Sequence, residues 1–397
     1  MKLAARATRV VPSPTLSITA TAKAMAAQGI DVVDFASGEP DFDTPEPVKA
    51  AAEAAIRAGF TKYTPSSGID ELRTAIADKL KAEQGLHYEK SQILVSCGAK
   101  HSLYNIAEAL LEAGDELIIP TPYWVSYHDQ VVLNDATPVL LHTREEEGYA
   151  IHEAELESKV TQHTKAIIIN SPSNPTGATY DHKTLEGIAA VALRNDLIII
   201  SDEIYEKVIY DDALHISIAT LGPDVAARTV IVNGVSKAYA MTGWRIGFAA
   251  GPKDLLTAMA NIQSQSTSNP CSISQKAAVA ALRTGAPFTR QMVQEFDRRR
   301  RSIVERLNKI PGVHCRMPSG AFYAFPNIAG VLNRRWKGGL LTSASDVANY
   351  LLQEARVAVV PGEPFGSGHH IRLSYATSMG AIEQGLNRIE QAIGRLA

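Results

Sequence analysis

Short apolar runs alternate along this chain with segments whose apolar residues recur at helical spacing. The runs at 93–96, 166–169, 197–201 and 230–233 are built mostly from Ile, Val and Leu. Continuous apolar runs of this length are typical of strands buried on both faces of a parallel sheet, where neither face meets water. With helical segments between them, they predict an α/β fold whose mostly parallel sheet is covered by helices on both sides.

A lysine follows one of these runs closely. Lys237 comes after 230–233, among small and hydroxylated residues rather than on a solvated helix face. An amine that is partly desolvated and close to a fixed cation, here Arg245, should have a lowered pKa, as a lysine needs for attack on a carbonyl carbon. An ordinary strand-end lysine that reaches solvent is the alternative, and the Ser236-Lys237 pair alone does not decide between the two.

Polar residues also follow two other runs. Because the carboxyl ends of parallel strands meet at one edge, Asp202 should share a crevice with Lys237. An aspartate there is suited to keep the pyridine nitrogen of pyridoxal phosphate protonated, and Tyr205 to donate to the ring's phenolate oxygen. Asn174 lies in the Pro- and Gly-rich turn 170–177 and is placed to share that oxygen. These residue types therefore point to pyridoxal 5′-phosphate as the cofactor.

The segment 93–100 supplies a candidate phosphate site. A strand turns through Gly98 and Ala99 into a helix, and small residues at a helix start leave free backbone N–H groups for an anion. Ser236 and the fork-shaped guanidinium of Arg245 would complete the site. A strand, a glycine and a helix in succession are by themselves weak support for a phosphate site. Four strand ends that together carry Lys, Asp and Tyr, Asn and Pro, and Gly and Ala are much stronger support.

Several segments resemble the class I/II aminotransferases and, more narrowly, the prokaryotic-type (Ib) aspartate aminotransferases; they are 37–42, 170–177, 202–205, 236–247 and 372–376. The resemblance runs from about Ser13 to the C-terminus. It implies the fold-type I architecture of pyridoxal-phosphate-dependent transferases, with a mostly parallel seven-stranded sheet between helices and a smaller α/β domain. We expect an N-terminal arm at 1–43 that also forms part of the small domain, a large cofactor-binding domain at 44–287 and a small C-terminal domain at 288–397.

The resemblance also implies roles for single residues. Lys237 would hold the cofactor covalently and then move the proton between the substrate's Cα and the cofactor's C4′. Trp124 and Ile204 would lie on opposite faces of the ring. Arg372 would grip the α-carboxylate with two contacts, and Gly38 would close over the substrate.

Lys100, directly after the phosphate cradle, matches a lysine that binds the distal carboxylate of a dicarboxylic substrate; the alternative is that it only adds positive potential near the phosphate. Thr15 and Ser17 match two hydroxyl positions near the same pocket. Many members carry a basic residue where this chain has Ser13-Pro14, a difference that argues against prephenate as a substrate. Tyr63 resembles a tyrosine that reaches the partner's cofactor phosphate, and it implies a homodimer with shared active sites.

The resulting candidate set has three parts. The catalytic residue is Lys237. The cofactor-binding residues are Tyr63, Gly98, Ala99, Lys100, Trp124, Asn174, Asp202, Ile204, Tyr205, Ser236, Lys237 and Arg245. The substrate-binding residues are Thr15, Ser17, Gly38, Lys100, Trp124, Asn174 and Arg372.

The implied activity is ping-pong transamination between L-aspartate or L-glutamate and 2-oxoglutarate or oxaloacetate. A relative with aromatic, alanine, kynurenine or prephenate/arogenate specificity is the first alternative, and Lys100 is the feature that discriminates against it. A non-catalytic pyridoxal phosphate sensor is the second, but such a regulator needs a helix-turn-helix module, for which the extent of the resemblance leaves no room. A decarboxylase is disfavoured, because Arg372 on the α-carboxylate would hold that bond in the ring plane.

Composition limits the classes of ligand that the protein is expected to bind. The formal net charge of -3 gives no electrostatic case for nucleic acid, so we expect small amino acids and 2-oxoacids as ligands. The basic run 298–301 follows a helical pattern with nearby acids and is interpreted as a solvated helix face. Three cysteines without CxxC spacing and the pair His369-His370 give no metal motif, so no metal is expected. Without an apolar leader or span, a cytoplasmic protein is expected.

Overall fold

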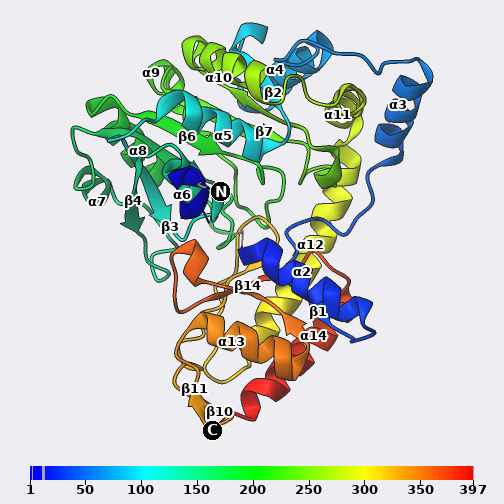
Figure 1. Cartoon of the computed structure of the whole chain (residues 1–397), viewed down its shortest axis with the longest axis vertical. Coiled ribbons are helices and arrows are strands. Elements are labelled where there is room, and N and C mark those ends of the chain that lie inside the picture. Colours follow the sequence, from blue (N-terminus) through cyan, green and yellow to red (C-terminus); the bar gives the residue numbers. More distant parts are fainter. Residues whose placement is uncertain (2, 11–13, 397) are drawn as a thin grey trace.

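The computed structural model describes residues 1, 3–10 and 14–396, and the side chains of residues 14–16 lie outside this description. Figure 1 shows two lobes, one built of helices around a central sheet and the other formed by the C-terminal part of the chain together with the N-terminal helix α2, Pro14–Ala27. The long helix α12, Ala286–Leu307, runs from the first lobe into the second.

The central sheet has seven strands in the order β2-β8-β7-β6-β5-β3-β4. All neighbouring pairs are parallel except those that β8 forms with β7 and β2. The expected mostly parallel seven-stranded sheet is therefore confirmed. The strands are β2 Ile93–Ser96, β3 Glu116–Thr121, β4 Thr137–His142, β5 Thr164–Asn170, β6 Ile198–Asp202, β7 Thr229–Gly234 and β8 Gly247–Ala250.

Helices cover both faces of this sheet because successive side chains of each strand point to opposite sides. Within β5, Ile168 packs with the cluster of α5, α6 and α10, while Ile167 packs with the cluster of α7, α8 and α9 on the other face. The helices of this lobe are α3 Glu46–Arg57, α4 Asp70–Gln84, α5 Ala99–Leu110, α6 Ser126–Leu133, α7 Glu153–Glu157, α8 His182–Arg194, α9 Pro223–Ala226, α10 Lys253–Ser266 and α11 Ser272–Thr284.

The register of the parallel strands brings their polar ends together. Asn170, the last residue of β5, pairs with Asp202, the last residue of β6. The next strand, β7, ends at Gly234, shortly before Lys237. β2 runs in the same direction as β7, because two antiparallel steps through β8 restore the direction, so its end at Ser96 lies on the same edge. The strand ends predicted to share a crevice do share one edge of the sheet.

The second lobe has its own core and small sheets. A three-stranded antiparallel sheet in the order β13-β14-β9 carries Arg372 in its central strand. Helices α12 and α14 and the strand pair β1 and β12 pack around one apolar cluster. The elements are β1 Val33–Asp34, β9 Tyr323–Ala324, β10 Arg335–Trp336, β11 Gly339–Leu340, α13 Ala344–Tyr350, β12 Val357–Ala358, β13 Val360–Pro361, β14 Ile371–Ser374 and α14 Met379–Gly394.

We propose that residues 1–43 form an arm and part of the small domain, that residues 44–287 form the large domain and that residues 288–397 form the rest of the small domain. The boundary at 287 and 288 lies inside the first turn of α12, so a continuous helix, rather than a flexible linker, joins the two domains.

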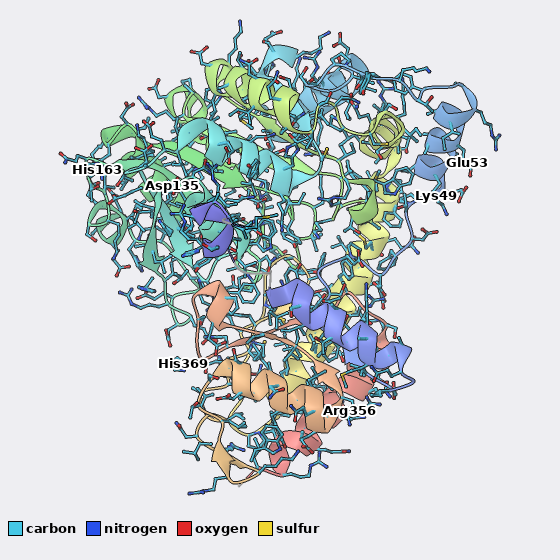
Figure 2. The ribbon with its side chains drawn as sticks, viewed as in Figure 1. Lys49, Glu53, Asp135, His163, Arg356 and His369 are labelled. Carbon is cyan, nitrogen blue, oxygen red and sulfur yellow. The ribbon has the colours of Figure 1, made fainter. Side chains whose placement is uncertain are left out.

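Charged side chains mark the periphery of both lobes. In Figure 2, Lys49 and Glu53 lie on the outer surface of α3, where Lys49 Nζ contacts Asp43 Oδ2 at 2.9 Å. Asp135 pairs with Arg9 of the short helix α1, Ala5–Arg9, which therefore lies against the large lobe next to α6. Among the described residues, no helix is both long and apolar enough to cross a membrane.

The interpretation of 298–301 as a solvated helix face is wrong for two of its four arginines. Arg298 and Arg301 are exposed, but Arg300 is only 1% exposed and Arg299 is also buried. Arg300 donates to Asp211, Asp297 and the carbonyl oxygen of Pro318. The carboxylate of Asp211 comes from a distant part of the chain, so the local charge pattern could not indicate that the arginine is buried.

The difference in burial between Arg300 and Arg301 gives a stability prediction. Arg300→Ala should lower the free energy of unfolding by about 3 kcal/mol, because it removes a buried cation and the side chain that lies over the Tyr210 ring at 4.5 Å. Arg301→Ala removes an exposed cation that pairs with the same Asp297 and Asp211, and should lower the free energy of unfolding far less, because solvent screens an exposed ion pair. Urea denaturation of both variants, followed by circular dichroism, measures the difference; equal losses would contradict it.

Candidate active site

A cavity of about 390 Å³ is lined by residues of both lobes, at the carboxyl edge of the central sheet. Most of the predicted site residues line it: Gly38, Ala99, Lys100, Trp124, Asn174, Asp202, Ile204, Tyr205, Ser236, Lys237, Arg245 and Arg372. The sequence pattern thus located one cavity from residues spread over more than three hundred positions.

Lys237 lies in this cavity beneath the N-terminal segment. Its Nζ donates to the carbonyl oxygen of Gly38 at 2.6 Å and is 5.8 Å from the centre of the Tyr205 ring. Desolvation lowers the pKa of the lysine to about 8; Glu39 opposes this shift, and the cations Arg372 and Arg245 add to it. A sizeable share of the amine is therefore neutral near physiological pH, which suits a nucleophile.

Asp202 ends β6 as a buried carboxylate with a donor on each oxygen. The Tyr127 hydroxyl donates to Oδ2 at 2.7 Å, and the Ile204 backbone N–H donates to Oδ1 at 3.2 Å. Burial raises the pKa of Asp202 to about 6, while these two donors and Lys237 act in the opposite direction. An ionised carboxylate accepts more than two hydrogen bonds, so Asp202 keeps acceptor capacity for a further donor in the cavity.

The turn into α5 forms a cradle that fits a phosphate. Gly98 has a φ of 93°, and a Cβ at this position would lie 2.3 Å from a terminal nitrogen of Arg245. A Cβ on Gly247 would lie 2.2 Å from the backbone nitrogen of Ala99, so glycine is required at both positions. The guanidinium of Arg245 and the positive end of α5 meet here, as anion binding requires.

Arg372 reaches the cavity from β14. Its two terminal nitrogens donate to Asn174 Oδ1 and to the Ala36 carbonyl oxygen, both at 2.9 Å. The guanidinium carbon lies 4.4 Å from the centre of the Tyr323 ring, and Nε has no hydrogen-bond partner among the described residues. A buried nitrogen with unused donor capacity is suited to bind an incoming carboxylate.

Asn174 and Tyr205 complete the wall. The carbonyl oxygen of Asn174 accepts from Arg372, so its amide NH₂ group keeps its donor capacity for a ligand. The Tyr205 hydroxyl lies 2.7 Å from that of Tyr323, which belongs to the other lobe. Both side chains are buried.

Lys100 and Trp124 lie together in the wall of the cavity. Lys100 Nζ is 4.8 Å from the centre of the Trp124 ring, a cation–π distance. Burial and the neighbouring Arg245 lower the pKa of Lys100, while Asp129 opposes them. Lys100 lines the cavity, and its side chain forms no salt bridge with a carboxylate of the described residues.

Three predicted residues, Gly98, Tyr63 and Ser17, do not line the cavity, although Gly98 directly precedes the lining residue Ala99. Tyr63 is 93% exposed on the protein surface, and Ser17 is exposed on α2. The side chain of Thr15 lies outside the described residues. From the same helix, Thr19 and Lys23 line the cavity instead.

Sequence reasoning missed several lining residues: Thr19, Lys23, Ala36, Ser37, Glu39, Leu103, Tyr127, Asn170, Thr242 and Tyr323. Tyr127 follows Trp124 by three residues, and that spacing at a helix start could have placed the two rings together. Tyr323 had no such signal, because only the pairing of Ser374 with Tyr323 between β14 and β9 brings it beside Arg372.

A second polar cluster lies behind Asp202. Glu203, Glu206 and His215 place possible metal-ligand atoms within 4.8 Å of one another. However, Lys79 Nζ contacts Glu206 at 2.5 Å, and Ser217 and Ser201 donate to Glu203, so these carboxylates already have partners. We read the cluster as structural support for the turn that carries Asp202 and Tyr205.

The two adjacent histidines near Arg372 separate in space. His369 is exposed and lies at the surface in Figure 2. His370 is buried, with Nδ1 at 2.7 Å from Ser367 Oγ and Nε2 at 3.2 Å from Glu145 Oε2. They do not form a joint ligand pair.

Comparisons with known proteins agree with this geometry. The family described as aminotransferase class I and II matches residues 30–389. The chain is 48% identical to the aspartate aminotransferase of Geobacillus stearothermophilus, over 98% of both chains, and 45% identical to an aspartate/prephenate aminotransferase of Nitrosomonas europaea, over 98% of this chain and 99% of that one. The crystal structure of the aspartate aminotransferase from Rhizobium meliloti superposes with a TM-score of 0.96 at 45% identity, covering all of both chains. With its lysine, aspartate and arginine in one cavity, the chain belongs to the class I and II aminotransferases.

Proposed function

We propose that this aminotransferase moves the amino group between L-aspartate or L-glutamate and the corresponding 2-oxoacids. One observation carries the proposal: Arg372 and Lys100 line the same cavity as Lys237, so a dicarboxylic substrate meets one cation for each carboxylate. The relatives named aspartate aminotransferase support it. The names that include prephenate belong to relatives of nearly equal identity and identify prephenate as the alternative substrate to test.

The cofactor of this family is pyridoxal 5′-phosphate, and the cavity has groups that fit each of its parts. Ser236, Arg245 and the backbone at Gly98 and Ala99 would bind the phosphate. Asp202 would bind the ring nitrogen. Asn174 and Tyr205 would donate to the ring oxygen, with Trp124 and Ile204 on the two ring faces.

When bound, the cofactor supplies an electron sink that stabilises the charge left on Cα after proton removal. Lys237 would hold the cofactor and, once the substrate amine has taken its place, would move the proton between Cα and C4′. Asp202 would keep the ring nitrogen protonated. Arg372 fixes the α-carboxylate, Lys100 binds the distal carboxylate, and the segment at Gly38 covers the site and limits the access of water.

We also propose a homodimer in which Tyr63 contributes to the partner's site. A tyrosine that is 93% exposed and lies outside its own chain's cavity supports this arrangement, since a protein interface would bury it. The expected cytoplasmic location stays a prediction.

Lys237→Ala tests the assignment directly. The variant should lose aspartate-dependent amino transfer, because the proton-transfer group is gone, while retaining the cofactor through the phosphate and ring contacts. Turnover with 2-oxoglutarate and the absorbance of bound cofactor measure the two effects. Lys253→Ala on the surface of α10 is the control and should behave as wild type; near-normal turnover in the Lys237 variant would refute the role.

The lowered pKa of Lys237 predicts how cofactor attachment depends on pH. Only the neutral amine attacks a carbonyl, so the rate at which the apo-protein attaches pyridoxal phosphate should rise with pH and level off above about 8. Stopped-flow absorbance over a pH series measures this rate. A midpoint near the usual lysine pKa of about 10.4 would show that burial does not act as described.

Lys100→Ala separates dicarboxylic from other substrates. Loss of a charge-assisted contact of about 1.5–3 kcal/mol should lower kcat/KM for aspartate and glutamate by roughly 10- to 100-fold, and that for alanine and phenylalanine far less. Lys100→Arg keeps the charge and should lose less. Equal losses for all four amino acids would leave Lys100 with only a general electrostatic effect.

A further inference from the structure

The hydroxyl of Tyr127 bonds Asp202, and the mechanism proposed above gives Tyr127 no role. We infer that Tyr127 is a positioning residue that keeps the Asp202 carboxylate ionised and fixed, so that the proton stays on the cofactor's ring nitrogen. The inference rests on the proposed function only in taking Asp202 as the partner of that nitrogen.

The geometry favours a fixed carboxylate. Tyr127 donates to Oδ2 and the Ile204 N–H donates to Oδ1, so each oxygen has its own donor and rotation of the carboxylate would break both bonds. The backbone beneath is also held, because Asn170 Nδ2 donates to the Asp202 carbonyl oxygen at 2.9 Å. Among these groups, the hydroxyl of Tyr127 is the donor that a point substitution removes without disturbing the main chain.

The surrounding charges explain why that donor matters. Burial raises the pKa of Asp202, and Glu203, the next residue, acts in the same direction. The Tyr127 hydroxyl, the Ile204 N–H and the Lys237 ammonium act against them, and Tyr205 is a further titratable neighbour. With the cofactor bound, Lys237 would be joined to it and would no longer offer a full ammonium charge to Asp202. The Tyr127 hydroxyl would then account for a larger share of the stabilisation of the Asp202 carboxylate.

Tyr127 is itself well held as a neutral donor. It lies near the start of α6 and is buried, and burial together with Asp202 raises its pKa well above the usual tyrosine value. Its ring meets the Trp124 ring edge-on, with 5.5 Å between centroids and an interplanar angle of 81°. Phenylalanine would preserve this ring packing, so the hydroxyl can be tested separately from the aromatic ring.

The sign of the effect follows from the hydrogen bond. Without the hydroxyl, the carboxylate loses a donor to its charged form and becomes more basic. The proton shared between Asp202 and the ring nitrogen then moves toward the carboxyl group. The ring nitrogen becomes partly neutral, and the cofactor becomes a weaker electron sink.

The experiment uses the full-length holoenzyme loaded with pyridoxal phosphate that carries ¹⁵N in the ring. The ¹⁵N resonance distinguishes a protonated from a neutral ring nitrogen without any turnover. Wild type and Tyr123→Phe should show the protonated form. Tyr123 is a buried tyrosine on the same segment, and its pKa is affected by burial and by the charge of Asp129 rather than by that of Asp202. Asp202→Asn provides the reference for a nitrogen that has lost its carboxylate.

Tyr127→Phe should move the resonance toward the Asp202→Asn reference and lower kcat about 10-fold or more, with a smaller change in KM. An unchanged resonance would overturn the inference, whether or not kcat falls, because a structural role alone would leave the ring nitrogen protonated. Failure of the proposed function would look different: wild type itself would not bind the cofactor or transfer the amino group of aspartate.

Discussion

The site depends on the in-register ending of neighbouring parallel strands. Asn170 and Asp202 are paired at the ends of β5 and β6, and the side-chain amide of Asn170 bonds the Asp202 carbonyl oxygen where the ladder stops. A slip of one residue would turn Asp202 from the cavity toward a helix-covered face. The apolar runs of these strands supply the burial energy, and their register decides which polar groups are brought together.

Burying charges at this edge requires compensation from both lobes. Arg372 comes from β14 in the second lobe, yet it donates to Asn174 in the first, and Tyr323 and Tyr205 meet in the same way. Substrate recognition and cofactor recognition are thus joined by hydrogen bonds that cross between the lobes. A change in their relative position would alter Arg372 and the partners of the cofactor ring together.

The sequence predicted the parts of the fold that depend on local patterns. Apolar runs located β2, β5, β6 and β7, and the residues after them marked the cavity, since a parallel sheet fixes where its strand ends meet. It failed where a partner is distant in the chain. The burial of Arg300 depends in part on Asp211, and the place of Tyr323 depends on its pairing with β14, neither of which leaves a local trace.

The buried cluster of Glu203, Glu206 and His215 also affects the ionisation of Asp202. Burial alone would raise the pKa of Glu203, yet His215, Ser217 and Ser201 hold it below its usual range. Glu203 therefore stays anionic directly beside Asp202, and its charge raises the basicity of that neighbour. The hydrogen bonds of Glu203 hold this turn in place, but the negative charge of Glu203 disfavours the ionised state that Asp202 needs. This opposition gives a physical reason for a strong donor on the other side of Asp202, which is where Tyr127 lies.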